Sequence, residues 1–277
     1  MNNIDVSYYL DAIDIIYWIN MDRSTERKSN MENLLKGINI PQKRIQATDA
    51  LSLSDEDLYS RYINLSKFNR TKIEYAVLHS HLKTIDEFSK LPNTYNNALI
   101  LEDDLTLEYS PFWNRKISDI IKNAPKNWDI IMLNYGSKYQ LLDLYTYNHE
   151  GKISSCLAYI INKKASVKLM NLVKNNSKYI LYDGFTHNAD DYIYSLLNVY
   201  AYRYPYFTYP DNNTSTIHPN HLLLHKYTKG IAERNWRELY NQSSLNDIVY
   251  MDMGIISNIS FIIIIVIFVY LFIKKYI

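Results

Sequence analysis

Apolar residues along this chain fall into short unbroken runs that alternate with stretches of helical periodicity. The runs predict buried strands at residues 13–19, 45–48, 98–101, 128–134, 154–162 and 199–209. The intervening patterns predict helices at 20–37, 73–89, 111–123 and 163–176, with one more starting near Asp190. Alternation of strands and helices at these lengths predicts an α/β fold with a mostly parallel sheet flanked by helices.

Three consecutive acids follow the run at 98–101: Glu102, Asp103 and Asp104. The carboxyl edge of an open α/β sheet is where ligands bind, so the acids stand at a candidate site. In an extended chain Glu102 and Asp104 point to one side and Asp103 to the other. Two such carboxylates can hold a hard divalent cation, which in turn can bind a diphosphate. A solvated turn followed by a helix cap explains the same acids without a ligand.

The amphipathic helix at 73–89 carries a second candidate pair. Glu74 and His81 fall within about 20° of each other around the helix axis, at the edge of the apolar stripe. Buried polar groups are costly without partners, so the two side chains either organise a site or are satisfied boundary residues.

The first predicted strand ends in a group of polar residues, Asn20, Asp22, Arg23 and Arg27. Cationic and hydrogen-bonding groups at this edge of a sheet can hold a nucleotide. The start of an ordinary surface helix accounts for the same residues.

Charge and composition narrow the classes of partner. The chain has 277 residues, with 30 basic and 29 acidic residues and a net charge of +1, which disfavours nucleic acid as a partner. A single cysteine excludes an intramolecular disulfide and indicates folding in a reducing compartment. The balance of 27 tyrosines to 6 glycines indicates an AT-rich genome such as that of a large DNA virus, so single tyrosines carry little functional signal.

The carboxyl-terminal segment predicts a membrane anchor. No charged residue lies between Asp252 and Lys274, and residues 255–273 would span roughly 28 Å as a helix. A buried core helix is the alternative. We therefore expect a main domain at 1–245, a linker at 246–254, a single transmembrane helix at 255–273 and a basic tail at 274–277.

The sequence leaves open which side of the membrane the main domain faces. The amino terminus lacks the basic region of a signal peptide, so tail-anchored insertion with a cytosol-facing domain is expected. Lys274 and Lys275 resemble a dilysine retrieval signal of the endoplasmic reticulum, which works only from the cytosolic side. A single span places the domain and the two lysines on opposite sides of the membrane, so a cytosol-facing domain and a cytosolic dilysine signal exclude each other. We favour the cytosol-facing domain, in a host or viral membrane.

Four segments in order, YWINMDRSTERKSNM, ATDAL, EYAVLHSHLKTI and ALILEDDL, resemble glycosyltransferase family 25, which includes lipopolysaccharide and procollagen galactosyltransferases. Further on, LAYIINKKASVKLM puts Tyr159 and Ala165 in register, and ADDYIYSLL puts Asp190 on a family aspartate with Asp191 one residue away. The resemblance covers about residues 13–220. It departs at Ala50, where the family has glycine, at Ala76 and Val77, where it has Gly-Cys, and in a missing proline before the late aspartate. The first two departures are expected to narrow the donor pocket.

The resemblance implies a GT-A-like, Rossmann-type fold and an inverting transfer of galactose or glucose to a hydroxyl on a glycan, lipid-linked or protein acceptor. The implied donor is a nucleotide-diphosphate sugar, UDP-galactose or UDP-glucose, used with Mn²⁺ or another divalent cation. Glu102 and Asp104 would hold the metal, and Asp190 or Asp191 would be the general base. The implied nucleotide-sugar-binding residues are Asn20, Asp22, Arg23, Arg27, Asp49, Glu74, Ser80, His81 and Asp103.

Two other functions stay open. A catalytically inactive, membrane-anchored scaffold or binding protein of the same fold would retain the pocket without turnover. A metal-dependent phosphodiesterase also needs clustered carboxylates, and four of the 7 histidines lie in residues 187–225.

Overall fold

The structure is a computed structural model that describes residues 5–65, 70–136, 141–149, 153–184, 186, 188–210 and 222–241. Within these residues a seven-stranded sheet has the order β2-β1-β4-β7-β5-β10-β6. Its strands are β1 (Ile15–Asn20), β2 (Gln42–Gln46), β4 (Asn97–Glu102), β5 (Ile130–Met132), β6 (Tyr145–Tyr147), β7 (Ala158–Asn162) and β10 (Val199–Tyr202).

Five strands run in one direction and two run against them. β2, β1 and β4 pair in parallel, as do β5 and β10, whereas β7 is antiparallel to both β4 and β5, and β6 is antiparallel to β10. The predicted α/β class with a mostly parallel sheet is confirmed. Because β7 is reversed, its amino end lies at the same edge as the carboxyl ends of β1 and β4.

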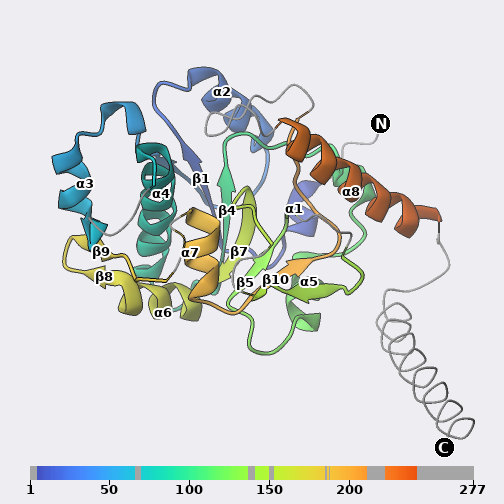
Figure 1. The fold of residues 1–277 in the computed structure, drawn as a ribbon. Coiled ribbons are helices and arrows are strands. Elements are labelled where there is room, and N and C mark those ends of the chain that lie inside the picture. Colours follow the sequence, from blue (N-terminus) through green and yellow to red (C-terminus); the bar gives the residue numbers. More distant parts are fainter. Residues whose placement is uncertain are drawn as a thin grey trace, which may run out of the picture.

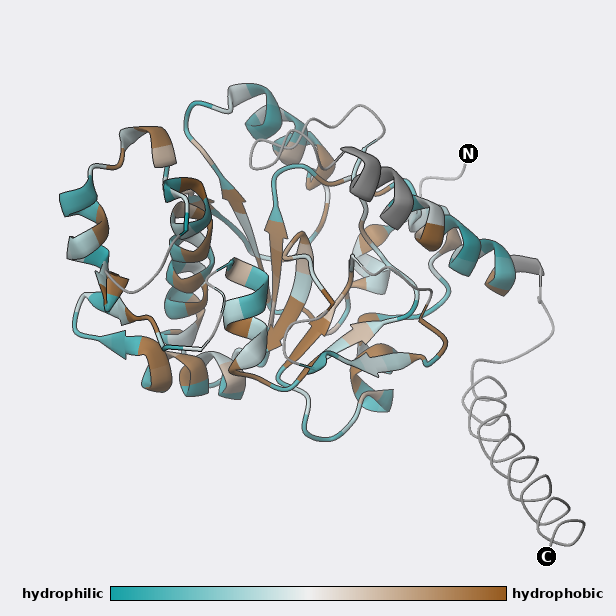
Figure 2. Cartoon of the chain, in the orientation of Figure 1, coloured by the Kyte–Doolittle hydropathy of each residue, from teal (hydrophilic) through white to brown (hydrophobic). Residues whose placement is uncertain are grey.

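Helices cover both faces of the sheet (Figure 1). One face packs against α4 (Lys72–Ser89), α6 (Lys163–Val173) and α7 (Ala189–Ser195), and the other against α1 (Val6–Tyr9), α2 (Thr25–Leu34), α5 (Ile117–Asn123) and α8 (Leu222–Asn241). In β4, Ala98 and Ile100 face the first set, and Leu99 and Leu101 face the second. Burial on both faces explains why the strand has no polar interruption, and Figure 2 shows the central strands as hydrophobic.

A smaller layer extends the α4 side. It contains the 3₁₀ turn η1 (Ala50–Ser52), α3 (Asp55–Arg61) and a three-stranded sheet of β3 (Tyr62–Ile63), β9 (Lys178–Ile180) and β8 (Lys174–Asn175). This layer begins directly after β2. Its first element, η1, lies beside the amino-terminal half of α4.

The predicted helix at 111–123 is wrong in its first half. A 3₁₀ turn, η3 (Ser110–Phe112), comes first, and α5 starts only at Ile117. Trp113 between them is extended and stacks on Tyr206 at 4.5 Å between ring centroids. Burial of this indole against the aromatic core takes the chain out of the helical path.

Helix α8 is not among the predicted elements. It is fixed to the sheet by Asn235, which donates to the Arg203 carbonyl, and by Trp236, which donates to the Pro205 carbonyl. The predicted linker, transmembrane helix and basic tail, residues 246–277, lie outside the described residues. Among the described helices, none combines the length and apolar character needed to cross a bilayer.

Candidate functional site

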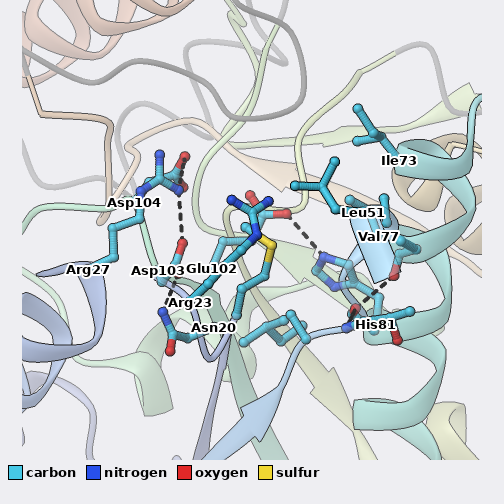
Figure 3. A pocket seen from close by; sticks show the side chains of 17 residues that line it. Asn20, Arg23, Arg27, Leu51, Ile73, Val77, His81, Glu102, Asp103 and Asp104 are labelled. Atoms are coloured by element: carbon cyan, nitrogen blue, oxygen red, sulfur yellow. Dashed lines mark hydrogen bonds and ion pairs between the residues drawn. The ribbon is translucent and has the colours of Figure 1, made fainter. Parts of the chain in front are cut away.

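A pocket of about 290 Å³ opens at the carboxyl edge of β1 and β4, against the amino-terminal half of α4 (Figure 3). This volume is close to the lower end of the range for small-molecule sites, about 300–1,000 Å³. Eight predicted site residues line it: Asn20, Arg23, Arg27, Ser80, His81, Glu102, Asp103 and Asp104. Five do not: Asp22, Asp49, Glu74, Asp190 and Asp191.

The three acids at the end of β4 have different partners. Glu102 Oε1 lies 3.1 Å from His81 Nε2 of α4. On the other side, Arg27 Nη1 of α2 lies 3.0 Å from Asp103 Oδ1 and 3.5 Å from Asp104 Oδ2. The predicted alternation is therefore wrong at Asp104, because β4 ends at Glu102 and the chain turns toward α2.

Asp103 is the most closely held of the acids. Asn20 Nδ2 donates to its Oδ2 at 2.6 Å, and Asn20 is itself buried and accepts from Arg44 Nε at 2.9 Å. Burial raises the pKa of Asp103 above its usual value, although Asn20 and Arg27 act in the opposite direction. A carboxylate with these two partners is positioned to orient Arg27 rather than to reach a ligand by itself.

The other polar residues after β1 form the outer rim. Arg23 Nε donates to Asp49 Oδ2 at 2.6 Å, and Asp22 accepts from Arg44 and Gln46 on β2. Asp49 also accepts from the Leu51 amide and so starts η1. Asp22 and Asp49 thus fix the geometry of the rim, while Arg23 lines the pocket.

The wall opposite Arg27 is mainly apolar. Leu51, Ile73 and Val77 lie along it in Figure 3, and Leu51 is 79% exposed. Ala50, Ala76 and Val77, the positions that depart from the family pattern, all line the pocket. The wall is tied together by Ser80, whose Oγ donates to the Ala76 carbonyl and accepts from the Thr48 amide.

Glu74 has a structural partner instead of a place in the pocket. Its Oε2 accepts from the amide and the hydroxyl of Thr71 at 2.8 and 2.9 Å, closing a capping box at the start of α4. The sequence signal was the spacing of Thr71 and Glu74 before an apolar helix. The predicted site-forming pair of Glu74 and His81 is therefore not brought together.

Asp190 and Asp191 lie in the first turn of α7, outside the pocket lining. Asp190 Oδ2 accepts from the Ser155 amide at 2.9 Å, and burial, with Asp191 nearby, raises its pKa above the usual value. Ser155 has a positive φ of 117°, which a non-glycine residue rarely adopts. That conformation turns the Ser155 amide toward Asp190 just before the amino end of β7. Asp191 accepts from Thr186 and Asn188 instead.

Tyr209 is a residue that the sequence did not single out. The backbone bridge between Thr106 and Thr208 brings it beside the segment that follows the acids. Burial raises the pKa of its hydroxyl well above the usual value, and Glu102, Asp104 and Asp190 raise it further. Tyr209 thus follows directly on the bridge that joins the segment after the acids to the second half of the described chain.

Glu102 and Asp104 are chemically suited to a hard divalent cation. Both are carboxylates on the pocket wall, with side chains 22% and 13% exposed. Over the described ranges, no group of three or more His, Cys, Asp or Glu side chains could hold a metal ion unaided. A cation bound at either carboxylate would take its remaining ligands from substrate phosphates and water.

Comparison with known proteins agrees with the motif order. The family model for glycosyltransferase family 25 (LPS biosynthesis protein) matches residues 13–186. A curated relative from Anopheles gambiae, a glycosyltransferase 25 family member, is 25% identical over 181 residues. That match covers 57% of this chain and 29% of the relative, so the chain spans less than a third of the relative's length.

Likenesses to solved structures are distant. A fruit-fly β-1,4-galactosyltransferase 7 mutant, solved with manganese, UDP-Gal and xylobiose, is 11% identical with a TM-score of 0.34, over 71% of this chain and 70% of that one. Mouse xyloside xylosyltransferase 1 is 12% identical with a TM-score of 0.28, over 68% and 72%. The family model covers well over half of the chain, and the chain belongs to glycosyltransferase family 25.

Proposed function

We propose that the chain transfers a hexose, galactose or glucose, from a nucleotide-diphosphate sugar to a hydroxyl acceptor with inversion. The single observation that supports this most is the composition of one pocket in the matched family region. It joins three acids and two arginines to an apolar wall. This combination suits a ligand with an anionic diphosphate at one end and a ring at the other.

The diphosphate is proposed to lie on the side of Arg23 and Arg27. A divalent cation, Mn²⁺ in the first instance, held by Glu102 and Asp104 supplies charge stabilisation for the leaving nucleoside diphosphate when bound. The arginines add N–H donors for phosphate oxygens at the same end, and Asp103 with Asn20 keeps Arg27 in place.

Asp190 is our preferred general base, with Asp191 as the alternative. Its burial supports this role, because a carboxylate with a raised pKa holds a proton more strongly than an exposed one. The Ser155 amide fixes one oxygen of Asp190. The proton of the acceptor hydroxyl would pass to this carboxylate as the hydroxyl oxygen attacks the anomeric carbon. The acceptor is proposed to be a glycan, lipid-linked or protein hydroxyl.

Membrane anchoring through residues 255–273 is part of the proposal. Its support is the unbroken run of thirteen apolar residues from Phe261 to Ile273. The folded domain is proposed to face the cytosol, at the endoplasmic reticulum or a viral membrane. Glycosylation-site insertions on each side of the segment test sidedness, and modification of a site within the folded domain would contradict it.

The deciding experiment measures donor hydrolysis by the full chain across UDP- and GDP-sugars, with and without Mn²⁺. Asp104→Asn is compared with Asp143→Asn, which removes an exposed carboxylate elsewhere. We expect Mn²⁺-dependent turnover of UDP-galactose or UDP-glucose in the wild type and in Asp143→Asn, and its loss in Asp104→Asn. Binding of UDP without turnover of any donor would indicate the inactive scaffold, and cleavage of phosphodiesters alone would indicate the hydrolase.

A further inference from the structure

Three side chains form a continuous hydrogen-bonded line from the core to the pocket. Tyr159 on β7 lies with its hydroxyl 3.1 Å from His81 Nδ1, and His81 Nε2 lies 3.1 Å from Glu102 Oε1. Tyr159 is 0% exposed and His81 is 1% exposed, whereas the Glu102 side chain is 22% exposed. The line therefore starts in the core and ends on the pocket wall.

The backbone gives this line a fixed frame. Tyr159 is paired with Ile100 across the antiparallel β4–β7 register, two residues before Glu102 on the same face. His81 reaches the line from α4, which packs on that face. Tyr194 of α7 packs edge-on against the Tyr159 ring, with 6.2 Å between centroids. The Tyr159 ring thus packs between His81 of α4 and Tyr194 of α7.

The direction of each hydrogen bond follows from the groups involved. A carboxylate only accepts, so the bond to Glu102 needs a proton on Nε2 of His81. In the neutral ring Nδ1 then carries the lone pair and accepts from the Tyr159 hydroxyl. Burial raises the pKa of Tyr159 well above the usual value, so this hydroxyl keeps its proton.

We propose that Tyr159 is a positioning residue: its hydroxyl donates to Nδ1 of His81 and, together with the acceptor Glu102 at Nε2, holds the ring as the Nε2–H tautomer, which in turn orients the Glu102 carboxylate toward the pocket. The opposite tautomer would place a lone pair of Nε2 against the Glu102 carboxylate and repel it. This inference rests on the proposed function only for the use made of Glu102. The tautomer itself is a property of the folded chain.

The functional consequence concerns ligand binding at Glu102. Hydrogen-bonded partners behind a metal-binding carboxylate contribute about 10- to 100-fold to affinity or activity. Tyr159→Phe removes one oxygen from a buried site and keeps the ring. We expect it to weaken UDP binding in the presence of Mn²⁺ by about 10-fold.

The first measurement is NMR of the full chain with ¹⁵N-labelled histidine. The His81 signals are assigned by their loss in His81→Gln. We expect the wild type to show a protonated Nε2 and an unprotonated Nδ1, and Tyr159→Phe to show a mixture of tautomers. Tyr62→Phe is the matched control, since Tyr62 is also buried and donates to the Tyr75 carbonyl, and neither residue lines the pocket. A wild-type ring protonated on Nδ1 or on both nitrogens, or an unchanged ring in Tyr159→Phe, would overturn the proposal.

The second measurement asks whether Tyr159 acts through His81. The amide of Gln at position 81 can donate to Glu102 without help from a phenol. Tyr159→Phe should therefore weaken Mn²⁺-dependent UDP binding about 10-fold in the wild type but little in the His81→Gln background. An equal loss in both backgrounds would mean that the phenol acts by another route, and no loss in either would mean that it does not position Glu102.

The two measurements separate the two hypotheses. Failure of the proposed function would leave the chain without Mn²⁺-dependent UDP binding in any variant, while the tautomer of His81 would still depend on Tyr159. Failure of the positioning role would leave UDP binding and transfer intact in Tyr159→Phe.

Discussion

Arg27 donates from Nη1 to Oδ1 of Asp103 across 3.0 Å, and the same nitrogen lies 3.5 Å from Asp104. The guanidinium thus acts as the internal counter-ion of two adjacent acids whose side chains are only 9% and 13% exposed. Without it, the two carboxylates would repel each other at the end of β4.

Arg27→Gln should lower the free energy of unfolding by about 1–3 kcal/mol, because it removes the guanidinium that pairs with two largely buried carboxylates. It should also weaken UDP binding. Urea denaturation and calorimetric titration measure the two effects. Lys28→Gln is the matched control, since the ion pair of Lys28 in the described part of the chain is with exposed Glu32 on the same helix. Equal stability of the two variants would contradict the counter-ion role.

Lys163→Met should destabilise the fold without affecting the pocket. The Lys163 ammonium donates to the carbonyls of Phe88, Ser89 and Leu91 and so caps the carboxyl end of α4. Loss of these bonds should lower the free energy of unfolding by about 1–3 kcal/mol. Lys164→Met, at the exposed neighbouring position, should leave it near the wild-type value. A larger effect at Lys164 would show that the capping bonds contribute little.

His79 should make the fold sensitive to acid. It is buried between Tyr62 and Tyr179 and hydrogen-bonded to Thr48, and burial lowers its pKa from 6.5 to about 3. Its contribution to stability is therefore present above pH 6.5 and is lost as pH falls toward 3. The loss is about 1.4 kcal/mol per pH unit within that window. His79→Asn should flatten the pH dependence measured by denaturation at several pH values, and an unchanged slope would contradict this.

Asp190→Asn should separate stability from activity. The raised pKa of Asp190 means that its stabilising contribution is present below pH 3.8, the usual value, and is lost as pH rises through the folded-state pKa. At neutral pH the asparagine variant should therefore resist urea better than the wild type, with the difference vanishing in acid. Transfer should fall about 10²- to 10⁴-fold, as expected for loss of a general base. Asp191→Asn serves as the comparison, and it would show the larger loss of transfer if Asp191 is the base.

Local patterns predicted the central strands because burial on both faces leaves unbroken apolar runs in the sequence. β4 is such a case, since four apolar residues between polar neighbours admit few alternatives to a buried strand. The direction of β7 leaves no such trace, because an apolar run has the same composition whichever way it runs. Its reversal depends on pairing with β4 and β5, which only the tertiary structure defines.

Site residues were predictable where they directly follow a strand. They were less predictable where a turn or a tertiary contact sets the direction of the side chain. Glu102 and Asp103 point as alternation requires, but Asp104 does not, because its direction is set by Arg27 and the turn after β4. The position of Glu74 on the helix predicted a place beside His81, whereas its spacing from Thr71 predicts a capping box. The structure shows the capping box. Tyr209 gave no signal at all, since its place depends on a backbone bridge between residues more than one hundred positions apart.

Every described residue that lines the pocket comes from residues 19–104, whereas Asp190 and Tyr209 come from the second half of the described chain. The segment that would recognise a donor is thus contiguous, and recombination after residue 105 between family members would exchange the acceptor side and leave the donor lining unchanged. In such a chimaera the second half would still need a tyrosine at position 159, because its hydroxyl contacts His81 in the first half.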